Sequence, residues 1–366
     1  MANNRIFYAT QAVALKGQNA DGSSINAEWY YPRGLQSVGI TTNFGLEQIF
    51  QLGQIELYDN IEDVPEVEVT MSKNIDGTVP LYLLCTNGHA SGISGSNHKE
   101  LVELANNRVN FRLSIYSDTD SLATGTPANY VTCSGMYLSS VSYSIPVDGI
   151  ATEDVTLVGN NKVWDTGILG TAGKSIDSVQ TAPASARRFK FNKNDSSLPT
   201  GSGGGIDGTR LQSIKISTDL GREAIFELGR MAPYFRYVKF PVEVTSEFEL
   251  VATEGDGVDA SDFSSTQGDC ETTYTNLLNK PIKVVICGSG SGDKLTVDLG
   301  DKNKLTSVNY TGGDTGGGNA TVTYSYQTFN KLKVSATGSF AYMSGVQVIS
   351  PPAPPAPPSP PSPPSP

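Results

Sequence analysis

Apolar and polar residues alternate along two stretches of the chain. In the first, Val67, Val69 and Met71 alternate with Glu68 and Thr70. The second stretch, 242–250, repeats the alternation with Val242, Val244, Phe248 and Leu250 on its apolar side. A period of two, with one apolar and one polar face, is typical of a half-buried antiparallel strand. The pattern therefore predicts a strand at the same place in each half of the chain.

Each of the two predicted strands follows a copy of a repeated sequence segment. "LQSVGITTNFGLEQIFQLG" at 35–53 aligns without a gap with "LQSIKISTDLGREAIFELG" at 211–229, which is 176 residues later (211 minus 35). Eleven of the nineteen aligned positions are identical. Pro65 and Pro241, which precede the two strands, keep the same offset.

Further matches extend the repeat. "LSSVSY" at 138–143 matches "LTSVNY" at 305–310, and "ATEDVTL" at 151–157 matches "ATVTYSY" at 320–326. Because the matched blocks occur in the same order, we interpret the chain as a tandem duplication. The predicted units are 1–165 and 206–349.

Each unit is predicted to be mainly β. Other strand candidates are 109–116, 129–138, 280–288, 293–300 and 329–336. Short strands separated by Gly, Asn and Asp turns favour a β-barrel or β-sandwich in each unit. A short helix is expected at 43–53 and at 219–229, with Asn43 and Asp219 as N-caps and Gly53 and Gly229 as helix ends. Gly45 and Gly221 disfavour a helix interior, so an irregular turn is the alternative.

Two segments lie outside these units. The connector, 166–205, holds a Gly-rich stretch and the basic cluster Arg187, Arg188, Lys190 and Lys193. It is either a solvated linker or an arm that pairs with an acidic face of a neighbouring subunit. The segment 350–366 is rich in proline, which fixes φ and removes backbone donors, so an extended polyproline tail that projects outward is expected.

Composition and charge limit the classes of function that the chain can have. The formal net charge of −11 disfavours general nucleic-acid binding, although a surface that DNA passes without adhering remains compatible with it. The sequence holds no apolar run of 18 residues, and we expect no membrane span and no secretory signal. The four cysteines form no C-x-x-C pair and are expected to be buried thiols.

The sequence contains only weak matches to the motifs of metal, phosphate-binding or catalytic sites. His89 and His98 share one loop with Cys85, but their spacing matches no standard zinc-ligand pattern. "GTAGKS" at 170–175 lacks the first glycine of a phosphate-binding loop, because Ile168 occupies that position. We therefore expect no enzyme, no cofactor and no metal site.

Three segments resemble virion structural proteins of tailed bacteriophages. They are "GLQSVGITTNFGLEQIFQLGQIELYDNIEDVPEVEVTMSKNIDGTVPLY" (34–82), "LGRMAPYFRYVKFPVEVTSEFEL" (228–250) and "SSVSYSIPVDGIATEDVTLVGNN" (139–161). The last is similar to the closing strands of phage tail tube proteins. The resemblance implies a β-barrel or sandwich unit with a short flanking helix, six of which join their sheets into a ring.

With two units in one chain, the resemblance implies a homotrimer that forms a pseudo-hexameric ring. Stacked rings would make a tail tube through which DNA is ejected. The implied partners are copies of the chain itself, and tail sheath, terminator or baseplate proteins. The implied location is the virion tail, assembled in the bacterial host cytoplasm. Other readings are a capsid decoration, a baseplate protein, an extracellular fibre, or an enzyme or small-ligand binder.

A duplicated chain in such a ring would place the shared residues at equivalent core or interface positions. An aspartate in place of Phe50 or Phe226 would then destroy folding or ring closure, because a buried unpaired charge is costly. The twelve shared positions singled out are Leu35, Ile40, Ile49, Phe50, Leu52, Gly53, Leu211, Ile216, Ile225, Phe226, Leu228 and Gly229.

Overall fold

A computed structural model gives the fold. It describes residues 6, 8–22, 29–86, 100–117, 127–166, 190–199, 206, 210–230, 232–253, 255–256, 258, 279–288, 292–313 and 318–340. The statements that follow concern these residues. The proline-rich segment 350–366, His89, His98, Cys270 and the segment 170–175 lie outside them.

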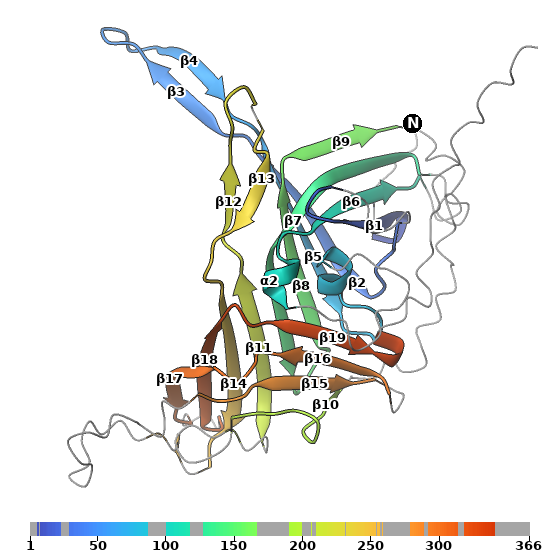
Figure 1. Cartoon of the computed structure of the whole chain (residues 1–366), viewed down its shortest axis with the longest axis vertical. Helices are drawn as coiled ribbons and strands as arrows, with labels where there is room; N and C mark the ends of the chain where they lie inside the picture. The colour runs from blue at the N-terminus through green and yellow to red at the C-terminus, as the bar shows by residue number, and fades with distance from the viewer. Residues whose placement is uncertain are drawn as a thin grey trace, which may run out of the picture.

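A large antiparallel sheet forms the body of the molecule (Figure 1). Its main path has eight strands in the order β17-β18-β14-β11-β7-β8-β5-β2. The strands are β2 (Leu35–Asn43), β5 (Glu66–Asn74), β7 (Asn129–Pro146), β8 (Thr152–Gly159), β11 (Leu211–Asp219), β14 (Glu243–Val251), β17 (Lys304–Thr311) and β18 (Thr321–Phe329).

The two halves of this sheet share order and register. β2-β5-β8-β7 comes from the first half of the chain, and β11-β14-β18-β17 comes from the second. The strand pairing has a register shift between Leu35 and Ser37 on β2, and an equivalent shift between Leu211 and Ser213 on β11. It slips again after Leu138 on β7 and after Leu305 on β17. Each position of one block therefore has a defined counterpart in the other.

A branch of the large sheet and a separate four-stranded sheet cover the apolar face of the main path, and each is called a smaller sheet below. β7 extends beyond the main path and pairs there with β6 (Arg108–Ile115) and β9 (Asn161–Asp165), and β6 pairs with β1 (Gln11–Gln18). A separate sheet has the order β10-β15-β16-β19. Its strands are β10 (Lys190–Phe191), β15 (Lys283–Cys287), β16 (Lys294–Asp298) and β19 (Lys333–Thr337).

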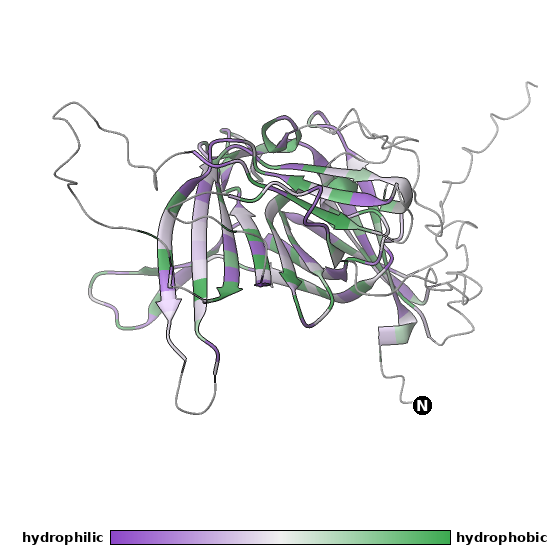
Figure 2. Ribbon diagram, turned by 90° about the horizontal axis from the view of Figure 1, so that it is seen from below, coloured by the Kyte–Doolittle hydropathy of each residue, from purple (hydrophilic) through white to green (hydrophobic). Residues whose placement is uncertain are grey.

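Alternating residues explain why the layers pack. On β5 and β14 the buried side chains include Val67, Val69, Met71, Val244 and Phe248, as the pattern predicts. They belong to one continuous core that also contains residues of the two smaller sheets. The hydropathy colours alternate along the strands in the same way (Figure 2). Burial of this apolar face is the main driving force for folding.

The structure confirms the mainly β class. The strand candidates at 67–71, 109–116, 129–138, 280–288 and 293–300 coincide with β5, β6, β7, β15 and β16. Within the described residues no sheet closes on itself, since the main path of the large sheet ends at β2 and β17. β10 lies in the segment that the sequence analysis assigned to the connector, and it pairs with β15.

The expected short helices at 43–53 and 219–229 are wrong. Asn43 and Asp219 end strands, and the following residues form hairpins instead. The first hairpin is β3 (Leu46–Phe50) with β4 (Leu57–Glu62), and the second is β12 (Arg222–Ile225) with β13 (Phe235–Val238). The described α-helices, α1 (Leu81–Thr86) and α2 (Leu101–Leu104), lie between β5 and β6. The described residues also include the 3₁₀ turns η1 (Tyr8–Thr10) and η3 (Gly338–Phe340).

A buried carboxylate holds α1 in the first half of the chain. Glu153 on β8 accepts hydrogen bonds from the backbone N–H groups of Leu81 and Tyr82 at 2.6 and 2.9 Å. It also accepts one from the Tyr143 hydroxyl at 2.9 Å. Burial raises the pKa of Glu153, and the nearby Lys73 together with these donors limits the rise. The carboxylate thus satisfies N–H groups that a six-residue helix leaves without intrahelical partners.

Replacing Glu153 with alanine should destabilise the fold strongly. The change leaves two buried N–H groups and a buried hydroxyl without their hydrogen-bond acceptor. This loss should lower the free energy of unfolding by about 3 kcal/mol or more. Chemical denaturation followed by circular dichroism measures the loss. Asp154→Ala is the matched control, because Asp154 is the exposed next residue on the opposite face of β8. Equal, small effects of both changes would contradict this role.

Candidate assembly interface

Two hairpin arms project from the same end of the large sheet (Figure 1). The first arm, 44–63, follows β2, and the second arm, 220–239, follows β11. Their registers agree, because Ile49 pairs with Asp59 in the first and Ile225 pairs with Phe235 in the second. The arms are therefore equivalent elements of the two halves.

Each arm turns at a Leu-Gly pair. Gly53 and Gly229 have φ of 87° and 88°, a conformation that glycine adopts without steric cost. The preceding Leu52 and Leu228 are fully exposed, at 102% and 105% of the reference area. Leucine at the tip of a surface turn has no role in this chain's own core, which points to contact with another molecule.

The first arm is apolar along most of its length and touches little else. Residues 43–48 and 50–60 are exposed, and β4 is exposed at every position. Its exposed large apolar side chains are Phe44, Leu46, Phe50, Leu52, Ile55, Leu57, Tyr58 and Ile61. So many exposed large apolar side chains on one hairpin are uncommon on a monomer and indicate an interaction site.

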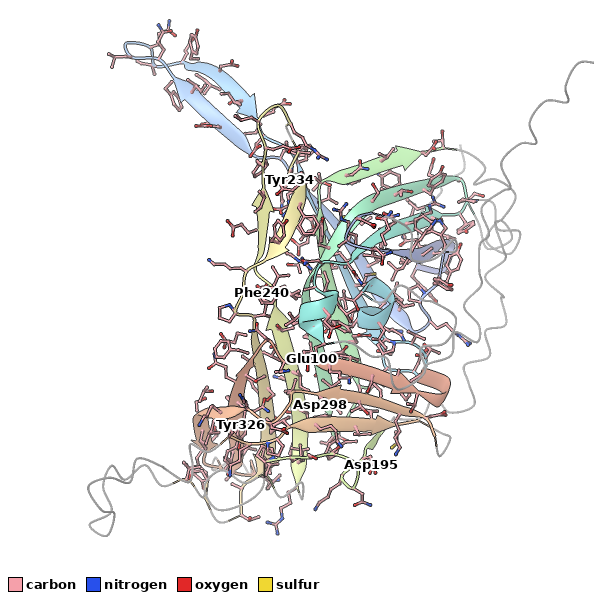
Figure 3. All side chains as sticks on the ribbon, viewed as in Figure 1. Glu100, Asp195, Tyr234, Phe240, Asp298 and Tyr326 are labelled. Carbon is pink, nitrogen blue, oxygen red and sulfur yellow. The ribbon has the colours of Figure 1, made fainter. Side chains whose placement is uncertain are left out.

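The second arm is fastened at its base to the first half of the chain. Arg222 donates to the carbonyl oxygens of Leu138 at 2.7 Å, Arg236 at 3.1 Å and Ala105. Burial lowers the pKa of Arg222 to about 10, which leaves the guanidinium charged at neutral pH. Figure 3 labels Tyr234 on this arm and Phe240 where its second strand returns to the body.

Three further contacts fasten the second arm. Arg236 forms an ion pair with Glu66 at 2.8 Å and donates to the side-chain oxygen of Asn160 at 3.1 Å. The ring of Phe235 meets the ring of Tyr137 edge-on, with centroids 5.4 Å apart. No hydrogen bond, ion pair or ring contact of this kind fastens the described residues of the first arm to the second half of the same chain.

The large sheet has an internal joint and two outer edges. At the joint, β7 of the first half pairs with β11 of the second, with Tyr143 opposite Ile216 and Val141 opposite Thr218. In the described part of the chain, the outer edge strands β2 and β17 each pair with one strand only. An edge strand presents unpaired N–H and C=O groups and is a template for pairing with another chain.

The outer edges expose residues whose counterparts are buried at the joint. Tyr143 on β7 is 1% exposed, whereas its counterpart Tyr310 on β17 is 50% exposed. Ile216 on β11 is 1% exposed, whereas its counterpart Ile40 on β2 is only partly buried. The outer edges therefore resemble the two sides of the internal joint after separation.

The second face of the large sheet is polar and acidic. Ser72, Asp154, Ser142, Ser217 and Thr245 form one row across five strands. This face carries the lysines Lys215 and Lys304 against seven carboxylates, Glu66, Glu68, Asp154, Asp219, Glu243, Glu247 and Glu249. The face is therefore polar along its length and has an excess of negative charge.

The structure places the twelve shared residues in two groups. Leu35 and Ile40 lie on β2 and their counterparts Leu211 and Ile216 lie on β11. The remaining eight, Ile49, Phe50, Leu52, Gly53, Ile225, Phe226, Leu228 and Gly229, lie on the arms. Phe50 and Phe226 are exposed in the single chain, so folding would not bury an aspartate placed there, while the expected loss of ring closure stays a prediction.

Sequence reasoning missed Arg222 and Arg236. Their counterparts in the first arm are Leu46 and Asn60, so the repeat gave no signal for them. It also missed that Tyr143 is buried while its counterpart Tyr310 is exposed, because the sequence does not show which strand lies at an edge of the sheet.

The described residues give little support for a metal site or a membrane-spanning helix. They contain no group of three or more His, Cys, Asp or Glu side chains placed to hold a metal ion. Cys85 and Cys133 are buried free thiols, and Cys287 is half-buried. None of the described helices is long and apolar enough to cross a membrane.

Comparisons with known proteins give only distant structural likenesses. No protein-family model and no curated protein matches the chain. Among solved structures, the chain is similar to the anti-feeding prophage cap, described as the tube-terminating cap, at 12% identity. The match covers 46% of this chain and 95% of the cap, with a TM-score of 0.29. A TM-score this low means that the two folds do not superpose as wholes, and the proposals below rest on this chain's own strands.

Removing the Arg222 side-chain donors should loosen the second arm without unfolding the body. In Arg222→Met, amide hydrogen exchange in β12 and β13 should accelerate about tenfold or more, because charged hydrogen bonds to the body are lost. Leu46→Met, at the equivalent position of the exposed first arm, should change exchange in β3 and β4 less than twofold. Unchanged exchange in Arg222→Met would show that these bonds do not hold the arm.

Proposed function

We propose that this chain is the subunit of a phage tail tube and that three chains form a pseudo-hexameric ring. The observation that carries the proposal is the pair of outer edges on β2 and β17. They are the counterparts of β11 and β7, which already pair inside the chain. A copy of the chain can therefore add its β2 to β17 by repeating an existing joint.

The register of the new joint follows from the internal one. Tyr143 opposite Ile216 corresponds to Tyr310 opposite Ile40 of the neighbour. Val141 opposite Thr218 corresponds to Val308 opposite Thr42. This register covers the exposed Tyr310 ring and pairs the edge backbone groups, both of which favour association.

Closure of such a ring produces a channel. Three chains with eight strands each give 24 strands in one continuous barrel. Barrels of about 16–18 strands already enclose an aqueous channel. The apolar face of the sheet packs against the smaller sheets, so the polar face is the one available to line the channel. Its carboxylates would repel the DNA backbone and let DNA pass without adhering.

Rings would stack into a tube through the arms, whose exposed leucine tips extend beyond the sheet. In this proposal the chain acts with copies of itself in the virion tail, is assembled in the bacterial host cytoplasm, and meets sheath, terminator or baseplate proteins at the tube. The role requires neither catalysis nor a cofactor.

A disulfide across the proposed joint tests both partner and register. Ser217 lies opposite Ser142 at the internal joint, and the counterparts are Thr41 and Asn309. In a chain carrying Thr41→Cys and Asn309→Cys, neighbours should cross-link on oxidation, since cross-strand positions meet the distance that a disulfide needs. Cys270→Ser and Cys287→Ser remove competing thiols. Non-reducing electrophoresis should show linked trimers as the largest product.

The matched control is Thr41→Cys with Thr311→Cys, which is out of register by two residues. Equal cross-linking of both pairs, or products larger than three chains, would contradict the three-chain ring. Negative-stain electron microscopy of the cross-linked product should show hollow rings. Monomers or solid fibres would instead favour the decoration, baseplate or fibre readings.

A further inference from the structure

The two arms are equivalent in fold but opposite in charge. The first arm, 44–63, contains five acidic residues and no lysine or arginine, which gives a formal charge of −5. The second arm, 220–239, contains four basic and two acidic residues, which gives +2. Around a three-chain ring the arms would alternate, with an acidic arm beside a basic one at every joint. This arrangement is attractive at each joint.

The fastening of the second arm defines where the first arm would lie. Arm 220–239 follows β11 and packs on the first half of the chain next to β7, where Phe235 meets Tyr137. The first arm follows β2, which in the proposed ring pairs with the neighbour's β17. The counterpart of Phe235 is Asp59, from the matched rungs of the two arms. The counterpart of Tyr137 is Lys304, which precedes the same slip in the ladder.

We propose that the first arm docks on the second half of the neighbouring chain, with Asp59 facing the neighbour's Lys304. The inference rests on the proposed ring and names the partner surface of the first arm. Where the internal joint uses an aromatic pair, the joint between chains would use opposite charges. Charge pairs between molecules steer encounter and set register.

An exposed aromatic side chain lies where the arm would dock. Arg236 of the second arm contacts Asn160 and Glu66. At the equivalent positions, Asn60 replaces Arg236, Phe329 replaces Asn160, and Glu243 replaces Glu66. Phe329 is 49% exposed in the single chain. The docked arm would bring Asn60 against Phe329 and Glu243, where its amide can donate to the carboxylate. Docking would thus cover apolar surface on both partners.

Charge exchange tests the Asp59–Lys304 contact. We expect Asp59→Lys to raise the protein concentration for half-assembly about fivefold, the size of effect that a partly exposed ion pair supplies. Lys304→Asp should have a similar effect, and the double variant should return to within twofold of the parent. Light scattering measures the concentration, and salt at about 1 M should shrink the differences because it screens the charges.

Glu56→Lys is the matched control, because it makes the same charge change nearer the tip of the arm. Combining it with Lys304→Asp should not restore assembly. If the Asp59 and Lys304 changes fail to rescue each other while the Thr41–Asn309 disulfide still forms, the ring stands and this docking site is wrong. If that disulfide does not form, the proposed ring fails and the docking inference fails with it.

Discussion

Backbone hydrogen-bonding groups at the edges of a sheet must find partners, and this requirement governs the rest of the molecule. β2 and β17 end the eight-strand main path of the large sheet, whose apolar face is already covered. Their outward N–H and C=O groups can be satisfied by water, but the partly exposed Ile40 and the exposed Tyr310 gain nothing from water. Pairing the two edges satisfies both needs in one step.

The internal joint between β7 and β11 is an example of that pairing within the chain. There Tyr143 and Ile216 are buried, and Arg222 and Arg236 of the second arm add charged hydrogen bonds to the same boundary. The joint within a chain is therefore reinforced by contacts whose residues are not repeated in the first arm. A ring built from such chains has two kinds of boundary, one fixed during folding and one formed during assembly.

Much of the fold was predictable from the sequence, because burial leaves a simple pattern. The alternation at 67–71 predicted β5, and the repeat predicted that the halves carry equivalent elements. The arms were predicted as helices because Asn43 and Asp219 were interpreted as N-caps and Gly53 and Gly229 as helix ends, whereas Asn43 and Asp219 end strands and the two glycines form hairpin turns. The first arm is exposed to solvent in the described part of the chain, and Gly53 with its φ of 87° favours a turn. Arg222 and Arg236 could not be predicted, since only the folded chain brings them to the carbonyl groups and carboxylate that they contact.

The eighteen-residue strand β7 has a mechanical consequence. It is an unbroken chain that belongs both to the large sheet and to the smaller sheet of the first half. In the second half the same path is split into β16 and β17, and the buried Asn303 side chain bridges the break through the carbonyl oxygens of Lys280 and Gly300. In the first half one extended strand thus joins the two layers, whereas in the second half the chain is irregular between β16 and β17, and the side-chain hydrogen bonds of Asn303 hold that stretch. In the proposed ring, sectors joined by a continuous strand would alternate around the circumference with sectors held by an irregular stretch, and the latter would yield first when the two layers are pulled apart.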